Sequence, residues 1–347
     1  MPVVPNFIER LLMLKLNIAP GPFLDLLGPW SFKALNTGLE LGIFEALAPG
    51  PLTPEQVATR IEGDERGTRL LLEALETVGY VRSKDGAYAN SAMTRKWLLE
   101  DSPSNMAGLI LHLDDATALW DNLADSIRRG TPVQEGYDFL LADEQRAKNF
   151  HAAMLSLART ASDEIVHRVK LPDGARRLLD LGGSHGLYSV RFCEVYAKLR
   201  ATVLDWPQAR PLAETTIRSN DLAERVEFRE GDYLEDDLGN NVDVALLFNI
   251  IHMYEPAANA SLFEKVGNSL NSGGTIVVMD QTEGAAPGPV GRAFAHLQAL
   301  NQFNSSTGQT YTARETEEML SAAGFGACRS LALKKSPGMG VVVASKP

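Results

Sequence analysis

The chain has 347 residues, of which 45% are hydrophobic and 22% charged, a composition typical of globular proteins and unlike that of disordered or fibrous ones. A chain of this length is expected to form two domains with a sizeable core. Its 44 acidic residues outnumber its 33 basic ones, and the net charge of −11 argues against nucleic acid and anionic membranes as partners.

The cysteine content and the apolar runs indicate in which cellular compartment the protein is expected. The chain has 2 cysteines, Cys193 and Cys328, far apart and without metal-ligand spacing around them, so neither a disulfide framework nor a metal site is expected. Charged residues interrupt the apolar clusters of residues 1–27, and no run approaches the roughly 18 uncharged apolar residues of a membrane span. We therefore expect a cytoplasmic protein with no membrane partner.

The N-terminal part of the chain predicts helices. Apolar side chains recur at helical spacing over Phe7–Leu16 and over Trp30–Leu47. In the second helix they form one wide apolar stripe, which another helix or another subunit must cover.

Residues 52–90 have the outline of a winged helix. Thr53 and Asp64 are capping residues that predict two helix starts, and Lys84–Gly86 predicts a tight hairpin turn. Winged helices often bind DNA, but residues 51–90 carry five basic and seven acidic side chains. A DNA-binding surface should be basic, so we expect no nucleic acid partner.

The pattern changes after a linker-like turn at residues 170–174. Residues 93–169 are predicted to be mostly helical, whereas apolar strands alternate with helices from residue 177 onward, which predicts an α/β domain with a parallel sheet covered on both faces. The predicted domains are therefore residues 1–170 and 171–347. The predicted strands are Arg177–Leu181, Thr202–Leu204, Val226–Arg229, Val242–Phe248, Thr275–Met279, Ala327–Leu333 and Val341–Ala344.

Glycines after the first predicted strand indicate a ligand cradle. The strand ends at Asp180, and Gly182, Gly183 and Gly186 follow before the next helix begins. Glycines at such a turn let the backbone approach a ligand closely, and the helix start offers free N–H groups. Ligands of doubly wound sheets lie at the carboxyl ends of the strands, so this loop predicts a nucleotide or nucleoside site.

The later strand ends favour an adenosine ligand. Asp205 falls 23 residues after Gly182, the distance at which a carboxylate accepts the hydroxyls of a ribose. Asp232 could accept a hydrogen bond from the adenine amino group, while Trp206 and Tyr233 offer apolar ring faces to the base. The chain has no Gly-Lys-Ser/Thr phosphate motif, which argues against ATP.

The order of these motifs resembles that of the class I S-adenosylmethionine-dependent methyltransferases. Over nearly its whole length the chain resembles the small-molecule O-methyltransferases related to the caffeate, acetylserotonin and hydroxyneurosporene enzymes. The resemblance implies a Rossmann-like, doubly wound seven-stranded methyltransferase domain, preceded by a mostly helical, winged-helix-like dimerisation domain. It also implies a homodimer through the N-terminal helices. The motifs that carry it are Asp180–Gly186, Asp205, Gly231–Tyr233, Asn249–His252 and Leu270–Gly274.

The resemblance implies S-adenosylmethionine as cofactor and S-adenosylhomocysteine as product, with no metal. The glycine loop would hold the methionine moiety, Asp205 the ribose, and Asp232 with Tyr233 the adenine. The expected cofactor-binding residues are Asp180, Gly182, Gly183, Gly186, Asp205, Trp206, Asp232, Tyr233 and Asn249.

The resemblance also implies an acceptor site between the two domains. Its walls are expected from Leu109–Trp120, Tyr137–Met154 and Arg292–Phe303. The expected substrate-binding residues are His112, Trp120, Tyr137, Phe150, Met154, Arg292 and His296.

His252 stands at the position of the family's catalytic histidine and would remove the proton of a hydroxyl acceptor. Asp280 is expected to orient it. The surroundings depart from the family pattern, because Met253 follows the histidine where plant-type members have aspartate, Phe248 replaces a lysine, and Ala313 stands where a second orienting acid is found. O-methylation with His252 as base is the first hypothesis.

Two other hypotheses remain open. S-methylation of a thioether acid such as 4-methylthio-2-hydroxybutyrate, as in dimethylsulfoniopropionate synthesis, needs alignment but no base. Arg292, His296, His112 or Tyr137 could then bind the substrate carboxylate. The third hypothesis is a non-catalytic cofactor-binding or regulatory winged-helix protein, against which the retained adenosyl contacts and the acidic balance of residues 51–90 argue. The sequence leaves the acceptor atom open among O, S, N and C.

Overall fold

The chain folds into two compact units, residues 1–114 and 115–347. The computed structural model describes residues 5–282, 284–285, 288–336 and 338–347. The unit boundary differs from the predicted one near residue 170, because the long helix α10 (Glu144–Arg168) packs against α11 (Leu187–Val195) of the second unit. The division of roles between residues 1–170 and 171–347 stays a prediction.

The first unit is helical, with one hairpin, and local signals set its element boundaries. The side chains of Thr53 and Asp64 accept hydrogen bonds from the N–H groups three residues on and so begin α4 and α5. Asp85 and Gly86 both have positive φ, as a two-residue hairpin turn requires. The elements are α1 (Phe7–Arg10), the π-helical turn η1 (Leu11–Lys15), α2 (Phe23–Glu40), α3 (Ile43–Ala46), α4 (Pro54–Arg60), α5 (Glu65–Thr77), β1 (Val81–Lys84), β2 (Ala87–Asn90), α6 (Ala92–Trp97) and α7 (Ala107–Thr117), which crosses the unit boundary.

The prediction of one continuous helix over Trp30–Leu47 is wrong. Helix α2 ends at Glu40, and Gly42 takes a left-handed conformation with φ of 69° before α3 begins. The apolar side chains before and after this break therefore pack within their own unit and need no other subunit to cover them. The side chains that form the buried cluster are Leu35, Ile43, Phe44, Leu47, Val57, Leu72, Leu75, Val81, Tyr88 and Leu98.

A different apolar set is exposed near the N-terminus. Its members are at least half exposed, from Leu26 at 50% to Phe7 at 80%. We call this set the N-terminal apolar surface; it comprises Phe7, Ile8, Leu14, Leu16, Ile18, Phe23, Leu26 and Trp30.

The second unit begins with helices and continues into the α/β part. The helical elements before the sheet are η2 (Ala118–Asn122), α8 (Leu123–Arg129), α9 (Gly136–Leu141) and α10. The strands are β3 (Arg177–Leu181), β4 (Arg200–Asp205), β5 (Val226–Glu230), β6 (Val242–Phe248), β7 (Leu270–Gln281), β8 (Gly326–Ala332) and β9 (Met339–Ser345). The helical elements between them are α11, η3 (Pro207–Ala209), α12 (Arg210–Ser219), η4 (Ile251–Met253), α13 (Pro256–Ser269), α14 (Gly288–Ser305) and α15 (Ala313–Ala322).

The seven predicted strands form one sheet in the order β5-β4-β3-β6-β7-β9-β8. The first five are parallel, as predicted, but β9 is antiparallel to both β7 and β8, so the sheet is mixed. The reason is the short connection between Ala332 and Met339. Parallel strands need a crossover of about a dozen residues or more, and a shorter connection joins antiparallel strands.

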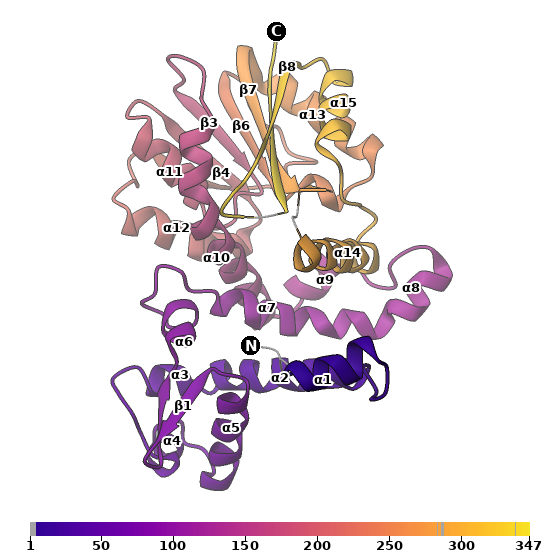
Figure 1. Cartoon of the computed structure of the whole chain (residues 1–347). Helices are drawn as coiled ribbons and strands as arrows, with labels where there is room; N and C mark the ends of the chain where they lie inside the picture. The colour runs from indigo at the N-terminus through magenta and orange to yellow at the C-terminus, as the bar shows by residue number, and fades with distance from the viewer. Residues whose placement is uncertain (1–4, 283, 286–287, 337) are drawn as a thin grey trace. The chain divides into compact units, whose positions relative to one another are not determined.

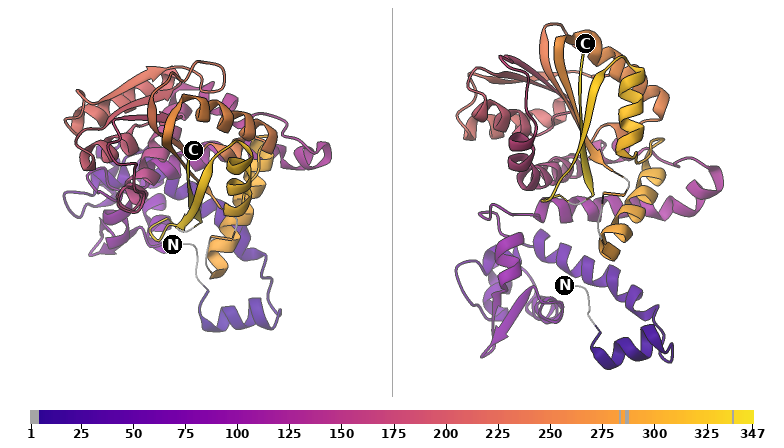
Figure 2. Two further views of the ribbon diagram at one scale, coloured as in Figure 1. Left: turned by 90° about the horizontal axis from the view of Figure 1, so that it is seen from above. Right: turned by 45° about the horizontal axis from the view of Figure 1, so that its top comes forward.

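Helices cover both faces of the sheet, as Figure 1 shows with α11 and α12 on one face and α13 and α15 on the other. The second view of Figure 2 shows the same two layers. Successive side chains of a strand point to opposite faces. Along β6, Val244 and Leu246 accordingly join the apolar cluster under α10 and α11, while Ala245 and Leu247 join the cluster under α13 and α15. The sheet is thereby buried on both sides.

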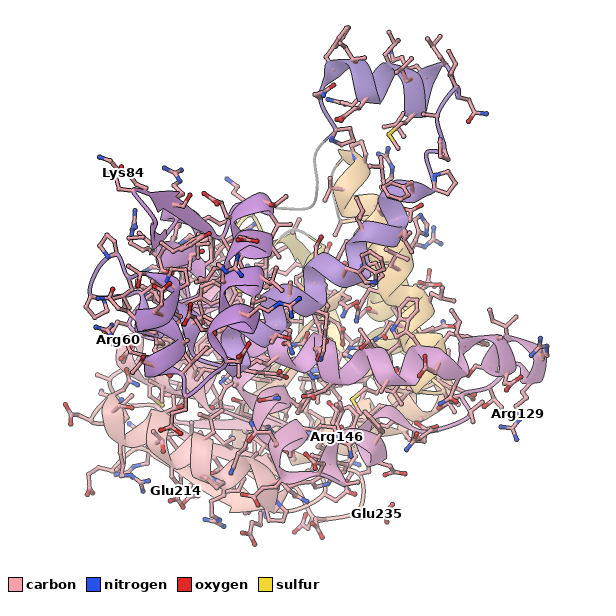
Figure 3. The ribbon with its side chains drawn as sticks, turned by 90° about the horizontal axis from the view of Figure 1, so that it is seen from below. Arg60, Lys84, Arg129, Arg146, Glu214 and Glu235 are labelled. Atoms are coloured by element: carbon pink, nitrogen blue, oxygen red, sulfur yellow. The ribbon has the colours of Figure 1, made fainter. Side chains whose placement is uncertain are left out.

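Charged side chains of both signs are distributed over different elements (Figure 3). Arg60, on α4, and Lys84, at the hairpin, are labelled there and lie apart. Glu214, on α12, pairs with Arg210 and Arg218 at 3.2 and 3.1 Å. Among the described residues, no helix combines the length and the apolar character needed to cross a membrane. The cytoplasmic location and the lack of a nucleic acid partner stay predictions.

Candidate functional site

A cavity lies where the parallel strands β3, β4 and β6 end, as expected for this sheet type. It encloses about 740 Å³ of space between the atoms, part of which is open to solvent. The structure brings ten of the predicted site residues together around it. These are Asp180, Gly182, Gly183, Asp205, Trp206, Tyr233 and Asn249 from the predicted cofactor set, and Tyr137, Phe150 and Met154 from the predicted substrate set.

The glycine loop packs too closely for side chains. Gly182 has φ of 62°, and a Cβ atom there would lie 2.5 Å from the Ile250 side chain. A Cβ on Gly183 would lie 2.6 Å from the Asp180 carboxyl carbon. Gly186, with φ of 67°, begins α11 and is not among the lining residues. The loop is thus shaped by backbone atoms at the cavity wall.

The Asp180 carboxyl is almost completely buried beside the glycine loop. Only 1% of the residue is exposed. Its Oδ2 accepts a hydrogen bond of 2.8 Å from the Ser189 hydroxyl, whereas Oδ1 is buried without a hydrogen-bond partner among the described residues. Burial raises the pKa of Asp180 to about 7, and the nearby Asp205 carboxyl adds to the shift. A cationic or hydrogen-donating ligand group would complete its surroundings.

Asp205 connects the ends of two neighbouring strands. Its Oδ2 accepts a hydrogen bond from the N–H of Ser184 in the glycine loop, and its Oδ1 accepts one from the N–H of Trp206, each at 2.7 Å. Burial raises the pKa of Asp205 to about 6, although both backbone N–H groups favour the charged form. Carboxylate oxygens have further lone pairs and can accept additional hydrogen bonds from a ligand.

Of the predicted adenine contacts, the structure places Tyr233 on the cavity and Asp232 outside its lining. The Tyr233 hydroxyl is 2.7 Å from the Tyr254 hydroxyl. Asp232 accepts a hydrogen bond from the N–H of Leu234, so its carboxylate caps the turn that follows β5.

Aromatic rings form one side of the cavity. Tyr137 lies edge-on to Phe150 at 5.3 Å and to Trp206 at 5.9 Å between ring centroids. Burial raises the pKa of the Tyr137 hydroxyl, so this group stays neutral. Phe248 also lines the cavity and lies edge-on to Tyr188 at 4.7 Å. These rings suit a flat, apolar ligand.

His252 and Asp280 form a close pair next to this cavity. The His252 Nδ1 is 2.6 Å from Asp280 Oδ1, and the backbone N–H of His252 is 3.3 Å from Oδ2. The histidine side chain is 14% exposed and the aspartate 4%. A carboxylate at Nδ1 fixes the proton there and leaves Nε2 free to accept one. Met253, the next residue, lines the cavity, whereas His252 itself does not.

The other predicted site residues lie elsewhere. Arg292 and His296, on α14, line a second cavity together with Thr310. Trp120 donates a hydrogen bond of 2.8 Å from its ring nitrogen to Asn301. His112 belongs to the first compact unit, and burial lowers its pKa to about 4. Ala313 begins α15 and packs on the apolar cluster under that helix.

Two buried histidines at the cavity were not predicted as site residues. His151, on α10, places Nδ1 2.8 Å from the Ser184 hydroxyl, and His185 accepts a hydrogen bond of 3.0 Å from the N–H of Leu187. Burial lowers the pKa of His151 to about 4 and that of His185 to about 3. In the sequence, His151 directly follows Phe150, a predicted site residue, and this was the available indication for it. Among the described residues, no group of three or more His, Cys, Asp or Glu side chains could hold a metal.

Two protein families match this chain. The O-methyltransferase domain matches residues 120–326, and the O-methyltransferase dimerisation domain matches residues 25–100. The chain is similar to 3-hydroxy-5-methyl-1-naphthoate 3-O-methyltransferase of Streptomyces sahachiroi, with 27% identity covering 91% of this chain and 92% of the relative. It is 28% identical to the N,N-dimethyltransferase OxyT of Streptomyces rimosus, covering 91% and 93% of the two chains.

Solved structures share the fold over nearly the whole chain. Human N-acetylserotonin methyltransferase in complex with SAM has a TM-score of 0.82 at 23% identity, covering 100% of this chain and 99% of that one. PigF with SAH has a TM-score of 0.81 at 23% identity, covering 96% of this chain and 100% of that one. At such identities the similarity establishes the fold.

Proposed function

Because the chain belongs to the O-methyltransferase family, we propose that it methylates a hydroxyl group of a small aromatic molecule with His252 as general base. As a member of this family it is an S-adenosylmethionine-dependent methyltransferase of small molecules. The observation that carries the finer proposal is the pair of His252 Nδ1 and Asp280 Oδ1 at 2.6 Å. An imidazole held in this tautomer can take a proton at Nε2.

The residues of the cavity suit the cofactor. The buried Asp180 Oδ1 has no hydrogen-bond partner among the described residues and would meet the α-ammonium of the methionine moiety. Gly182 and Gly183 leave no room for side chains and would hold that moiety against the backbone. Asp205 would accept the ribose hydroxyls, and Trp206 and Tyr233 would contact the adenine. When bound, S-adenosylmethionine supplies an electrophilic methyl group on a sulfonium.

The acceptor is proposed to be a phenol or a hydroxylated polycyclic ring. The aromatic side of the cavity, formed by Tyr137, Phe150 and Trp206, suits a flat ring. The relative from Streptomyces sahachiroi is named for a hydroxynaphthoate acceptor, and the Streptomyces glaucescens relative TcmO, 27% identical, for tetracenomycin polyketide synthesis. His252 would remove the hydroxyl proton while the cavity residues align the oxygen with the methyl group.

The test of the base uses the pH dependence of His252→Ala with a phenolic acceptor. A phenol has an ordinary pKa of about 10, so near neutral pH it needs a base, whereas above about pH 10 it ionises unaided. We expect His252→Ala to lower kcat/KM about a hundredfold or more at neutral pH and to recover most of it at high pH.

Two variants serve as controls for this test. Asp280→Asn should show the same pH-dependent loss, because it removes the acceptor that fixes the His252 tautomer. His167→Ala, at an exposed histidine near the end of α10, should keep wild-type activity throughout. A kcat/KM of His252→Ala within about threefold of wild type at neutral pH would end the base assignment.

N-methylation is the second candidate, and the similarity to the N,N-dimethyltransferase OxyT supports it. A neutral amine, like the thioether of the S-methylation hypothesis, has no proton that must leave before it attacks. Either acceptor would therefore react with similar kcat/KM in wild type and His252→Ala. Assaying matched phenol, aniline and thioether acceptors with both proteins distinguishes the three.

A homodimer is proposed as well. The match of residues 25–100 to a dimerisation domain supports it, and so do the apolar side chains near the N-terminus that are half exposed or more, among them Trp30 at 68%. Apolar sets of this size on a soluble protein commonly form an interface.

A further inference from the structure

The charges around the cavity at the ends of β3, β4 and β6 are unbalanced. Its lining includes two carboxyl groups, those of Asp180 and Asp205, and, among the described residues, no lysine or arginine. The methionine moiety of the proposed cofactor carries an α-ammonium and an α-carboxylate. Asp180 suits the ammonium, and among the lining residues the side-chain hydrogen-bond donors left for the carboxylate are neutral groups.

One ring nitrogen of His151 makes no hydrogen bond to the described part of the chain. The residue is 6% exposed and lines the cavity from α10. Its Nδ1 is 2.8 Å from the Ser184 hydroxyl of the glycine loop. Its Nε2 is buried and has no hydrogen-bond partner among the described residues. Buried polar atoms are nearly always paired, so a bound ligand is expected to supply the partner of this nitrogen.

His185, the other buried histidine of the cavity, shows what a structural role looks like. Its Nδ1 accepts a hydrogen bond from the N–H of Leu187 at 3.0 Å, and its ring also bonds to the backbone of Met154. Both ring nitrogens of His185 are thus hydrogen-bonded to the backbone of the protein. His151 differs because the protein engages only one of them.

We propose that His151 is a cofactor-positioning residue whose Nε2–H binds the α-carboxylate of the methionine moiety. The inference rests on the proposed function, since it assumes that the cavity takes S-adenosylmethionine. Burial keeps the ring neutral with a single N–H, because it lowers the pKa of His151 to about 4. When the Ser184 hydroxyl donates a hydrogen bond to Nδ1, the single ring proton of His151 resides on Nε2. The contact with Ser184 therefore permits the tautomer that can donate to an anion.

Two isosteric variants separate the ring nitrogens of His151. In His151→Asn the side-chain amide reaches the position of Nδ1, where its oxygen can accept from the Ser184 hydroxyl, but it leaves nothing at Nε2. In His151→Gln the amide nitrogen reaches the position of Nε2 and can still donate there. Thermal unfolding of both variants checks that they fold.

The measurement is calorimetric binding of two ligands to wild type and to each variant. The first ligand is S-adenosylhomocysteine, and the second is its decarboxylated form, 5′-(3-aminopropylthio)-5′-deoxyadenosine, which lacks only the α-carboxylate. We expect His151→Asn to bind S-adenosylhomocysteine about tenfold to a hundredfold more weakly, since hydrogen bonds to charged groups are the stronger ones. Its affinity for the decarboxylated ligand should change less than about threefold, and His151→Gln should recover much of the loss.

Other outcomes would overturn the inference in distinguishable ways. Equal weakening of both ligands in His151→Asn would mean a general structural role. Unchanged binding of both, with a large fall in kcat, would place His151 on the acceptor instead. If wild-type protein bound neither ligand, the proposed cofactor site would itself be wrong, whereas normal wild-type binding with no selective effect of His151→Asn would reject only the carboxylate contact.

Discussion

The Asp180 carboxyl makes the stability of the free protein depend on pH. An unfolded aspartate ionises near pH 4, whereas burial raises the pKa of Asp180 to about 7 in the folded chain. Between these pH values the folded state holds a proton that the unfolded state has lost. The contribution of Asp180 therefore lowers the free energy of unfolding as the pH rises from about 4 to about 7.

Asp180→Asn should remove this dependence. The amide has nearly the same shape and can still accept from Ser189. Relative to wild type, the variant's free energy of unfolding should rise by about 2 kcal/mol between about pH 5 and about pH 8, as measured by urea denaturation without ligand. The histidines His151 and His185 are present in both proteins, so their opposite pH effects cancel. A difference that stays constant with pH would contradict the assigned shift.

Single residues could be predicted where their position along the chain carries the information. Asp180, Asp205 and Asn249 each stand at or next to the end of an apolar strand, and all three line the cavity. His151 could not be found this way, because a polar residue in a helix looks the same in sequence whether it faces solvent or a cavity. Asp232 shows the converse, since an acid after a strand also serves as a cap, and here its carboxylate accepts the Leu234 N–H.

At the scale of elements, the glycine loop between β3 and α11 depends on the absence of Cβ atoms. Gly183→Ala should weaken S-adenosylhomocysteine binding about tenfold or more and lower the free energy of unfolding by about 1–3 kcal/mol, because the new methyl group meets Asp180 and Val203 within 3 Å. Gly267→Ala is the matched control. Its Cβ would meet only Phe325 at an ordinary 3.5 Å, within α13, so this change should stabilise the protein slightly. Calorimetry and urea denaturation give both quantities, and equal effects of the two variants would contradict the assignment.

The N-terminal apolar surface should decide the oligomeric state. Trp30, on α2, is 68% exposed, and a charge placed there would make burial against a second copy costly. We expect Trp30→Glu to shift the protein from dimer to monomer in sedimentation velocity. Leu70→Glu, on α5, is the control, because Leu70 is 51% exposed in the same unit but lies outside this surface. A wild-type monomer, or dissociation by both variants alike, would contradict the assignment of this surface.

Elements whose ends carry local signals were predictable. Thr53 and Asp64 cap α4 and α5, and the hairpin turns at Asp85 and Gly86. The break at Gly42 was missed because the apolar spacing runs on through it, although the backbone turns there. Spacing reports which side chains are buried and not whether the helix between them is continuous.

For the whole molecule, cofactor binding should raise the temperature of thermal unfolding. A ligand at about 100 times its Kd stabilises the folded state by about 2.7 kcal/mol. For a unit the size of residues 115–347 this corresponds to a rise in Tm of roughly 5–10 °C. We expect S-adenosylhomocysteine to produce such a shift in calorimetric unfolding of wild type and a much smaller one in Asp205→Ala. An equal shift in both proteins would place the ligand elsewhere.

The architecture as a whole was largely predictable, because the alternation of apolar strands and helices is a property of the chain alone. All seven strands of the sheet were expected, with ends that differ from the structure by a few residues. The orientation of β9 was not. It depends on which elements pack together in space, which spacing along the chain does not report.

The position of β9 also has a consequence for how the protein is made. This strand follows β7 and β8 in the chain, yet it lies inside the sheet between them. Its Gly340 pairs with Asp280, the partner of His252. Until β9 has been synthesised, β7 therefore presents an unpaired edge beside Asp280, and such edges invite aggregation. The sheet can close only once β9 has been made, so a truncation that removes Met339–Ser345 should take away an interior strand and leave Asp280 without its Gly340 neighbour.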